Sequence, residues 1–157
     1  MPDSLYERDA LAWSERQTDL LRRIAAGERL NEDVDWANVI EEIQDVGLGE
    51  LHSCETSLVK AMFLLLQLRA DSGSPDVPDW RCEALLALAD AEQSFSPSMR
   101  QRINLQSLYS DSVWQVWAGA EKVEDRLNVT GICPFTLDDL LADQPDFLAL
   151  MGRTSEA

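Results

Sequence analysis

Residues 35–70 read DWANVIEEIQDVGLGELHSCETSLVKAMFLLLQLRA, and this stretch decides the fold class. Apolar residues recur along it at spacings of three and four, which is the period of an amphipathic helix. They fall in two runs: Trp36, Ile40 and Ile43, then Leu51, Cys54, Leu58, Met62, Leu65 and Leu68. Gly47 and Gly49 lie between the runs, and each glycine inside a helix costs about 1 kcal/mol relative to alanine. We therefore predict one long helix that is kinked or broken near Gly47.

The segments on either side show helical spacing with clear start and stop signals. The pattern Ser4-x-x-Glu7 is a capping box, and Gly27 is placed to end the helix that it begins. Asp76 and Pro78 start a third segment that extends to residue 95, and Ser96-Pro97 start a fourth that we expect to continue as one helix to about Leu127. Thr136 and Asp139 cap a short last helix over residues 137–142.

Strand signals are almost absent, and short polar connections separate the helical segments. Long amphipathic helices joined by short loops favour an antiparallel bundle. The predicted fold is therefore all-α, with about four main helices and a short C-terminal helix. We expect a single domain over residues 1–147 and a frayed tail over residues 148–157.

The charge of the chain is strongly acidic. Its 157 residues include 13 Lys and Arg against 29 Asp and Glu, for a net charge of −16. Residues 31–60 hold eight acidic residues and one basic one, Lys60. Such a surface repels the phosphates of nucleic acids and of anionic membranes, so direct binding to either is not expected. A basic protein partner would be attracted, although acidity also serves solubility alone.

The chain shows no targeting or membrane signal. Its most apolar run, residues 61–68, is far shorter than the roughly 20 residues that span a bilayer. Its three cysteines, Cys54, Cys82 and Cys133, are widely spaced, which is typical of free thiols in a reducing compartment. We therefore expect a cytoplasmic protein.

A divalent metal site is one chemical hypothesis for this chain. Glu41, Asp45, His52 and Glu55 share one helical stripe and are carboxylate and imidazole ligands of the type that metals use. A second helix would have to complete the coordination sphere. The di-iron pattern of ferritin-like bundles needs two Glu-x-x-His units and is absent, because His52 is the one histidine. A solvated acidic face explains the stripe more simply, so no cofactor is predicted.

No catalytic residue is predicted. Cys54 and His52 are two positions apart and point to different helix faces, and Cys54 fits the core. Glu41 and Glu42 are a conceivable acid/base pair, but adjacent helical residues diverge by about 100°. We expect one of them to face water and the other to pair with an arginine.

The five tryptophans divide into two groups. Trp13, Trp36, Trp80 and Trp117 lie on the apolar stripes and are expected in the core. Trp114 lies off the stripe, where an exposed indole would suit a partner-binding surface. Trp114, Glu41 and Glu42 are therefore the candidate partner-binding residues.

Several stretches together resemble a known family. They are the start from Tyr6 to Trp13, the segment DWANVIEEI with Gly47 four residues after it, and the stretch ICPFTL at residues 132–137. Together they resemble the bacterial helical family catalogued as domain of unknown function 29, over roughly residues 5–147. The resemblance implies a helical fold and a bacterial source but no activity, so it supplies no catalytic residues.

The leading interpretation is a non-enzymatic interaction module that associates with itself or docks a protein partner. Two alternatives stay open. One is a metal-dependent or carboxylate enzyme that uses the acidic stripe around His52. The other is an acidic antagonist of a basic partner, whose binding would weaken steeply with salt.

Overall fold

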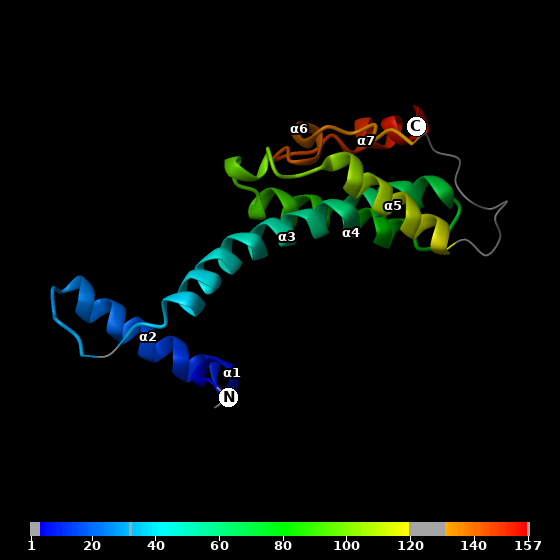
Figure 1. Ribbon diagram of the computed structural model, residues 1–157. Helices are drawn as coiled ribbons and strands as arrows, with labels where there is room; N and C mark the ends of the chain where they lie inside the picture. Colours follow the sequence, from blue (N-terminus) through cyan, green and yellow to red (C-terminus); the bar gives the residue numbers. More distant parts are fainter. Residues whose placement is uncertain (1–3, 32, 120–130, 157) are drawn as a thin grey trace. The chain divides into compact units, whose positions relative to one another are not determined.

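The computed structural model describes residues 4–31, 33–119 and 131–156 and is helical, with no strand in those ranges (Figure 1). The chain clusters into two compact units, Met1–Leu48 and Gly49–Ala157. The all-α prediction is confirmed, whereas the single predicted domain corresponds to these two units. Within the described residues, no helix combines the length and apolar character that crossing a bilayer would require.

The first unit begins with two helices in place of the single predicted one. Helix α1 (Leu5–Arg8) starts at the expected capping box, in which Ser4 and Glu7 bond each other's backbone amides. Asp9 then leaves the helical conformation, and its side chain accepts a hydrogen bond from the Ala12 amide to start α2 (Ala10–Ala25). An aspartate is a good N-cap, which is why the helix restarts there. Gly27 follows α2 with φ of 80°, as its predicted role requires.

Helix α3 (Trp36–Ala70) is the long helix that the central stretch predicts. Asp35 precedes it and accepts hydrogen bonds from the amide and side chain of Asn38, which is the usual pattern of an N-cap. The helix continues through Gly47 and Gly49, so the predicted alternative of a break is wrong. Added hydrogen bonds along 35 residues outweigh the cost of two glycines. Its first part belongs to the first unit and the remainder to the second.

Helix α4 (Val77–Ser94) pairs with the second half of α3 in antiparallel register. Lys60 forms an ion pair with Glu83 at 3.1 Å, and one and a half turns earlier Cys54 Sγ lies 3.5 Å from the Ala91 carbonyl oxygen. A later residue of α3 thus contacts an earlier residue of α4, so the two helices run antiparallel. The figures show the two helices side by side in this unit (Figure 1).

The fourth predicted segment is shorter and more broken than expected. A single turn, η1 (Pro97–Met99), follows the Ser96-Pro97 signal, and helix α5 (Leu105–Gly119) starts only after Asn104. The Asn104 side chain accepts from the Ser107 amide at 3.1 Å, so this asparagine acts as a new cap. The prediction of one continuous helix from residue 97 is therefore wrong. Its expected end near Leu127 lies outside the described residues.

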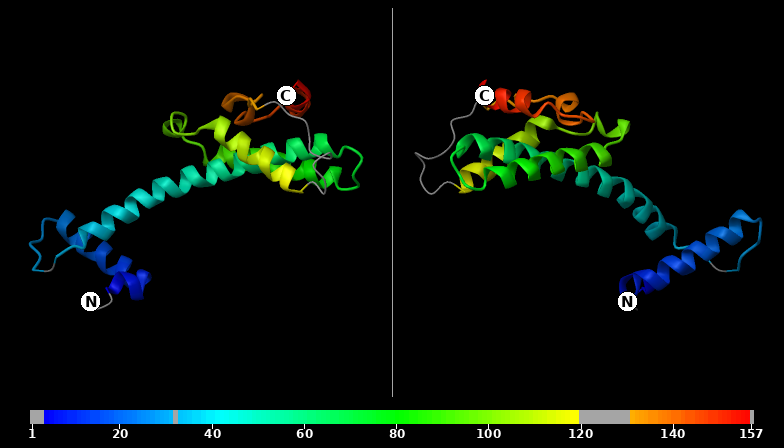
Figure 2. Two further views of the ribbon diagram at one scale, coloured as in Figure 1. Left: turned by 45° about the vertical axis from the view of Figure 1, so that its right-hand side comes forward. Right: turned by 180° about the vertical axis from the view of Figure 1, so that it is seen from behind.

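The C-terminal region is more ordered than predicted. Thr136 and Asp139 form the expected capping box of α6 (Leu137–Leu140). Residues expected to fray instead form α7 (Phe147–Glu156), in which Leu150 is 2% exposed and Thr154 is fully buried. Burial of this apolar face supplies the stability that a weak sequence pattern does not. Both views of Figure 2 show α6 and α7 on one side of the layer made by α4, α5 and the second half of α3.

Each unit has its own hydrophobic cluster. The small cluster of the first unit is built from Trp13, Leu20, Val34 and Val39. The large cluster of the second unit draws on every helix there, and its fully buried members are Cys54, Leu58, Ala61, Met62, Leu65, Leu66, Ala91 and Leu140. The large cluster fixes the relative positions of α3 and α5, and these two helices line the groove described next.

Candidate functional site

A groove lies between α3 and α5 in the second unit. Its volume is about 470 Å³. Four side chains from each helix line it: His52, Glu55, Thr56 and Val59 from α3, and Leu108, Asp111, Trp114 and Gln115 from α5. Both sets have helical spacing of three and four, so each helix presents one continuous stripe to the groove.

Ser112 holds the two helices together beneath the groove. Its side chain is fully buried, and its hydroxyl lies 3.1 Å from the Val59 carbonyl oxygen and 2.9 Å from that of Leu108. A serine permits closer backbone approach than a larger residue would, and the hydroxyl satisfies the buried carbonyl of the neighbouring helix. This contact therefore fixes the relative positions of the two helices that form the walls of the groove.

The groove is acidic and partly aromatic. Glu55 and Asp111 each bring a carboxylate, and no lysine or arginine lines it. Trp114 is 68% exposed, which fits its position off the apolar stripe in the sequence. Among the residues that the structure describes, neither Glu55 nor Asp111 forms an ion pair or side-chain hydrogen bond. Two unneutralised carboxylates beside an exposed indole favour cationic ligands.

The structure separates the four candidate metal ligands. His52 and Glu55 line the groove, whereas Glu41 and Asp45 belong to the other unit. Across the described parts of the chain, no three side chains of the His, Cys, Asp or Glu type gather closely enough to hold a metal ion. Asp111 of α5 lines the same groove as His52 and Glu55, but these three side chains do not form such a group. Within the described residues, no set of metal ligands therefore forms around the predicted stripe.

A second feature is an exposed apolar face on the first turns of α3. We call it the α3 stripe and define it as Trp36, Ile40, Ile43 and Val46, whose exposed fractions lie between 53% and 70%. The prediction that Trp36 lies in the core is therefore wrong, and Ile40 and Ile43 of the same apolar run are exposed with it. The hydrophobic period identified the helix correctly, but the residues that meet the first unit's core lie elsewhere on it.

Helices α1 and α2 pack beside the α3 stripe and leave it uncovered. Val39, between two stripe residues, is the α3 side chain buried against Trp13 and Leu20. Glu42 accepts a hydrogen bond of 2.8 Å from the Tyr6 hydroxyl, so its partner is a tyrosine and not the arginine that we expected. Glu41 is exposed to solvent. This bond, with the charges of Glu42, Glu41 and Asp45 and some burial, raises the pKa of Tyr6 to about 12.

The start of α3 is anchored to α2 by Asp35. Trp13 donates its indole N–H to Asp35 Oδ2 at 3.1 Å, and the Gln17 side chain accepts from the Asp35 amide at 2.9 Å. The hydrogen bond from Asn38, opposed by some burial and assisted by Trp13, lowers the pKa of the Asp35 carboxyl. An ionised cap is the stronger acceptor at a helix N-terminus. These contacts fix the start of α3 against α2.

Two of the three cysteines, Cys54 and Cys133, are packed in the second unit, whereas Cys82 is exposed. Cys54 is buried, and burial together with the charge of Glu55 raises the pKa of its thiol. Burial likewise raises the pKa of Cys133, and the hydrogen bond to the Phe135 carbonyl oxygen lowers it by less. Higher pKa values reduce the thiolate fraction and therefore the nucleophilicity at neutral pH. Cys54 belongs to the large cluster, as predicted, and Cys133 packs against it.

Comparison with known proteins decides the family. The sequence profile described as "Domain of unknown function DUF29" matches residues 5–147. The chain belongs to this family. No curated protein matches the chain. An α-helical protein of unknown function from Rhodospirillum rubrum has a similar solved structure, with a TM-score of 0.70 and 24% identity over 96% of this chain and 97% of that one. At this identity the likeness supports the fold alone.

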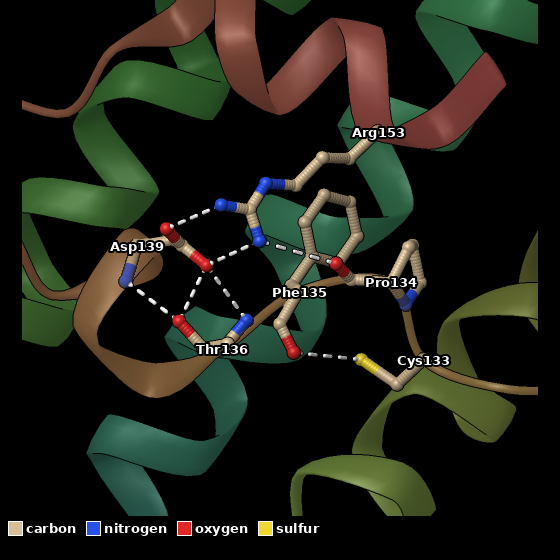
Figure 3. Close-up of polar contacts among 6 residues, drawn as sticks. All are labelled: Cys133, Pro134, Phe135, Thr136, Asp139 and Arg153. Carbon is tan, nitrogen blue, oxygen red and sulfur yellow. Dashed lines mark hydrogen bonds and ion pairs between the residues drawn. The ribbon is translucent and has the colours of Figure 1, made fainter. Parts of the chain in front are cut away.

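The Cys-Pro-Phe-Thr stretch of this DUF29 chain lies immediately before α6 and contacts α7 through Arg153 (Figure 3). Arg153 on α7 forms an ion pair with Asp139 on α6 and also donates to the Pro134 carbonyl oxygen at 3.4 Å. Asp139 in turn accepts from the Thr136 amide at 3.0 Å and from its hydroxyl. The Cys133 amide donates to the Gln106 side chain of α5 at 2.9 Å. These contacts attach the motif to α5, α6 and α7.

Sequence reasoning found three of the groove's eight lining residues as site candidates: His52, Glu55 and Trp114. It missed Asp111, which lies one turn before Trp114 on the same face of α5. That spacing was visible in the sequence. The pairing of this face with the α3 residues was not, because it depends on which side of α5 the buried Ser112 and Val116 occupy.

Proposed function

We propose that this DUF29 protein is a non-enzymatic interaction module that docks an apolar helix face, from a partner or from a second copy, onto the α3 stripe. One observation carries the proposal. Four large apolar side chains of the first unit are more than half exposed, and they follow one another along one face of α3 at spacings of four, three and three residues. Scattered exposed apolar residues are ordinary, but a row of them along one helix is typical of a helix-docking surface.

The charge around the α3 stripe favours a partner over a second copy. Glu41 and Asp45 flank the stripe, and no lysine or arginine occurs between Leu30 and Val59. Two copies would bring like charges together, whereas a partner helix with basic flanks would neutralise them. Burial of the α3 stripe would supply affinity for a partner helix and for a second copy alike. The flanking charges would then decide which of the two binds.

The test compares two double variants of the full chain. Ile40→Ser with Ile43→Ser removes the centre of the stripe, and Leu86→Ser with Leu148→Ser removes equally apolar, exposed side chains from the other unit. Oligomeric state is measured by sedimentation velocity and native mass spectrometry, and co-purifying proteins are quantified from native cells. We expect the stripe variant alone to lose an oligomer or a partner. Identical oligomers and identical partner sets for both variants would overturn the proposal.

One further variant tests the charge beside the stripe, and another serves as a control from the other unit. Glu41→Lys reverses an exposed charge without touching the Tyr6 contact, which belongs to Glu42. We expect Glu41→Lys to weaken the binding of a basic partner and to strengthen self-association. Trp114→Ala lies in the other unit and is expected to leave stripe-dependent association unchanged.

A further inference from the structure

We propose that the groove between α3 and α5 binds an arginine-containing basic segment of a protein partner, with the guanidinium held between Glu55, Asp111 and the ring of Trp114. The site is separate from the α3 stripe, because all eight lining residues belong to the second unit. The inference therefore goes beyond docking at the stripe and can fail or succeed independently of it.

The lining selects for positive charge. Elsewhere in the second unit, neighbouring cations neutralise several carboxylates: Lys60 pairs with Glu83, Arg100 with Asp138 and Arg153 with Asp139. In the groove, by contrast, the described structure leaves Glu55 and Asp111 without a cation. Two carboxylates on facing helices attract a cation more strongly than a single exposed carboxylate does.

The shape and the indole favour guanidinium over a metal ion or a lysine ammonium. A volume of about 470 Å³ is far larger than a bare ion fills, and the described ligand set contains no three-residue metal cluster. A guanidinium is planar, stacks on an indole face and offers five donors to carboxylate and amide oxygens. Glu55, Asp111 and the Gln115 side chain supply such acceptors, and Trp114 supplies the exposed ring.

The apolar part of the lining points to a protein segment as the source of the guanidinium. Val59 and Leu108 are half-buried side chains in the same groove, so a ligand with apolar groups beside its charge buries more surface than a free cation does. A second copy of this chain is the poorer candidate, because each copy carries a net charge of −16. A nucleic acid would meet the same repulsion.

The experiment uses the full chain and a short, acetylated and amidated peptide with arginines spaced by leucines. Binding is measured by fluorescence anisotropy of a label on the peptide. A peptide with citrulline in place of arginine keeps the shape and removes the charge, and a lysine peptide keeps the charge and removes the planar group. N-acetyl-arginine amide, as an unlabelled competitor, represents a free small ligand.

Two charge-matched double variants separate the groove from the general acidity of the chain. Glu55→Gln with Asp111→Asn removes the two groove carboxylates, and Glu92→Gln with Asp90→Asn removes two exposed carboxylates from α4. Both double variants have the same net charge. Trp114→Leu removes the ring, and circular dichroism with thermal unfolding checks that each variant is folded.

We expect saturable binding of the arginine peptide with a dissociation constant in the micromolar range. The groove double variant should weaken binding about tenfold, since two charge-assisted contacts are lost. Trp114→Leu should weaken it about fivefold, and the α4 control by no more than about twofold. The citrulline peptide should not bind, and the lysine peptide should bind more weakly than the arginine peptide.

Three results would overturn the inference. Equal weakening by the two double variants would show attraction to net charge alone. Competition by N-acetyl-arginine amide at the peptide's own affinity would identify a small-molecule ligand in place of a protein segment. Absence of saturable binding up to about 1 mM peptide would exclude the site. The serine variant of the α3 stripe should bind the peptide normally, so a failure here is distinguishable from a failure of the proposed function.

Discussion

Arg153 and Asp139 form a two-point ion pair that joins α7 to α6. Arg153 Nη1 lies 2.7 Å from Asp139 Oδ2, and Nη2 lies 2.9 Å from Oδ1. Parallel contacts of this kind fix the relative orientation of both groups, which a lysine would not do. Because Asp139 also completes the capping box of α6, one carboxylate both starts a helix and holds the next helix against it.

Asp139→Asn should lower the free energy of unfolding by about 1 kcal/mol at neutral pH. The estimate is modest because the Arg153 side chain is 38% exposed and water screens the pair. Urea unfolding measures the change. Asp138→Asn is the matched control, since Asp138 pairs with Arg100 while 78% exposed, and it should cost less than about 0.5 kcal/mol. An equal cost for both would contradict the structural role of Asp139.

The contribution of Asp139 should disappear in acid. Partial burial opposes ionisation, but hydrogen bonds from Thr136 and the charge of Arg153 outweigh it and lower the pKa of Asp139. A carboxyl whose pKa is lower in the folded state stabilises the fold above its unfolded pKa of about 3.9. This stabilisation is lost as the pH falls through the folded pKa. Wild type and Asp139→Asn should therefore converge in stability below that pH, and a constant difference would contradict the assignment.

Tyr6 should titrate well above a free tyrosine. Its hydrogen bond to Glu42, with the nearby negative charges, raises its pKa to about 12. A raised phenol pKa adds stability that is present below the unfolded value of about 10 and is lost as the pH rises toward the folded value. Phenolate absorbance of wild type, Tyr6→Phe and Glu42→Gln measures it. Glu42→Gln should move the Tyr6 transition down toward its usual value, and an unchanged transition would contradict the contact.

The sequence predicted secondary structure well wherever a cap and a period agreed. Ser4 with Glu7, Gly27, and Thr136 with Asp139 all occupy their predicted positions, because capping depends on residues within one turn. The errors at Asp9 and Asn104 have a common origin. Both residues form N-caps within segments whose apolar spacing continues past them, and the cap prevailed over the period.

Packing could be predicted less well than local structure. The period of Trp36, Ile40 and Ile43 correctly indicated a helix, but which face meets a neighbour is decided by contacts distant in sequence, here Val39 with Trp13 and Leu20. The groove shows the same limit. His52, Glu55 and Trp114 were candidates from the sequence, whereas their meeting in one groove depends on the contact of Ser112 with Val59.

Neighbouring residues on α3 should differ sharply in their effect on stability. Val39→Ala removes a side chain that is 7% exposed and should cost about 2 kcal/mol, whereas Ile40→Ala, at a side chain 54% exposed, should change stability by less than about 0.5 kcal/mol. Urea unfolding followed by tryptophan fluorescence measures both. Similar costs for the two variants would mean that the α3 stripe is already buried in solution, as in a stable oligomer.

Substitution of two glycines by alanine should have opposite effects. Gly27 has φ of 80°, which an L side chain adopts at a cost, so Gly27→Ala should lower the free energy of unfolding by about 1–2 kcal/mol. Gly49 lies inside α3 with nothing within 4 Å of the position of an added methyl group. Gly49→Ala should therefore raise stability by about 0.5–1 kcal/mol. Thermal and urea unfolding of both variants check the signs, and a destabilising Gly49→Ala would show that the helix does not continue through this position in solution.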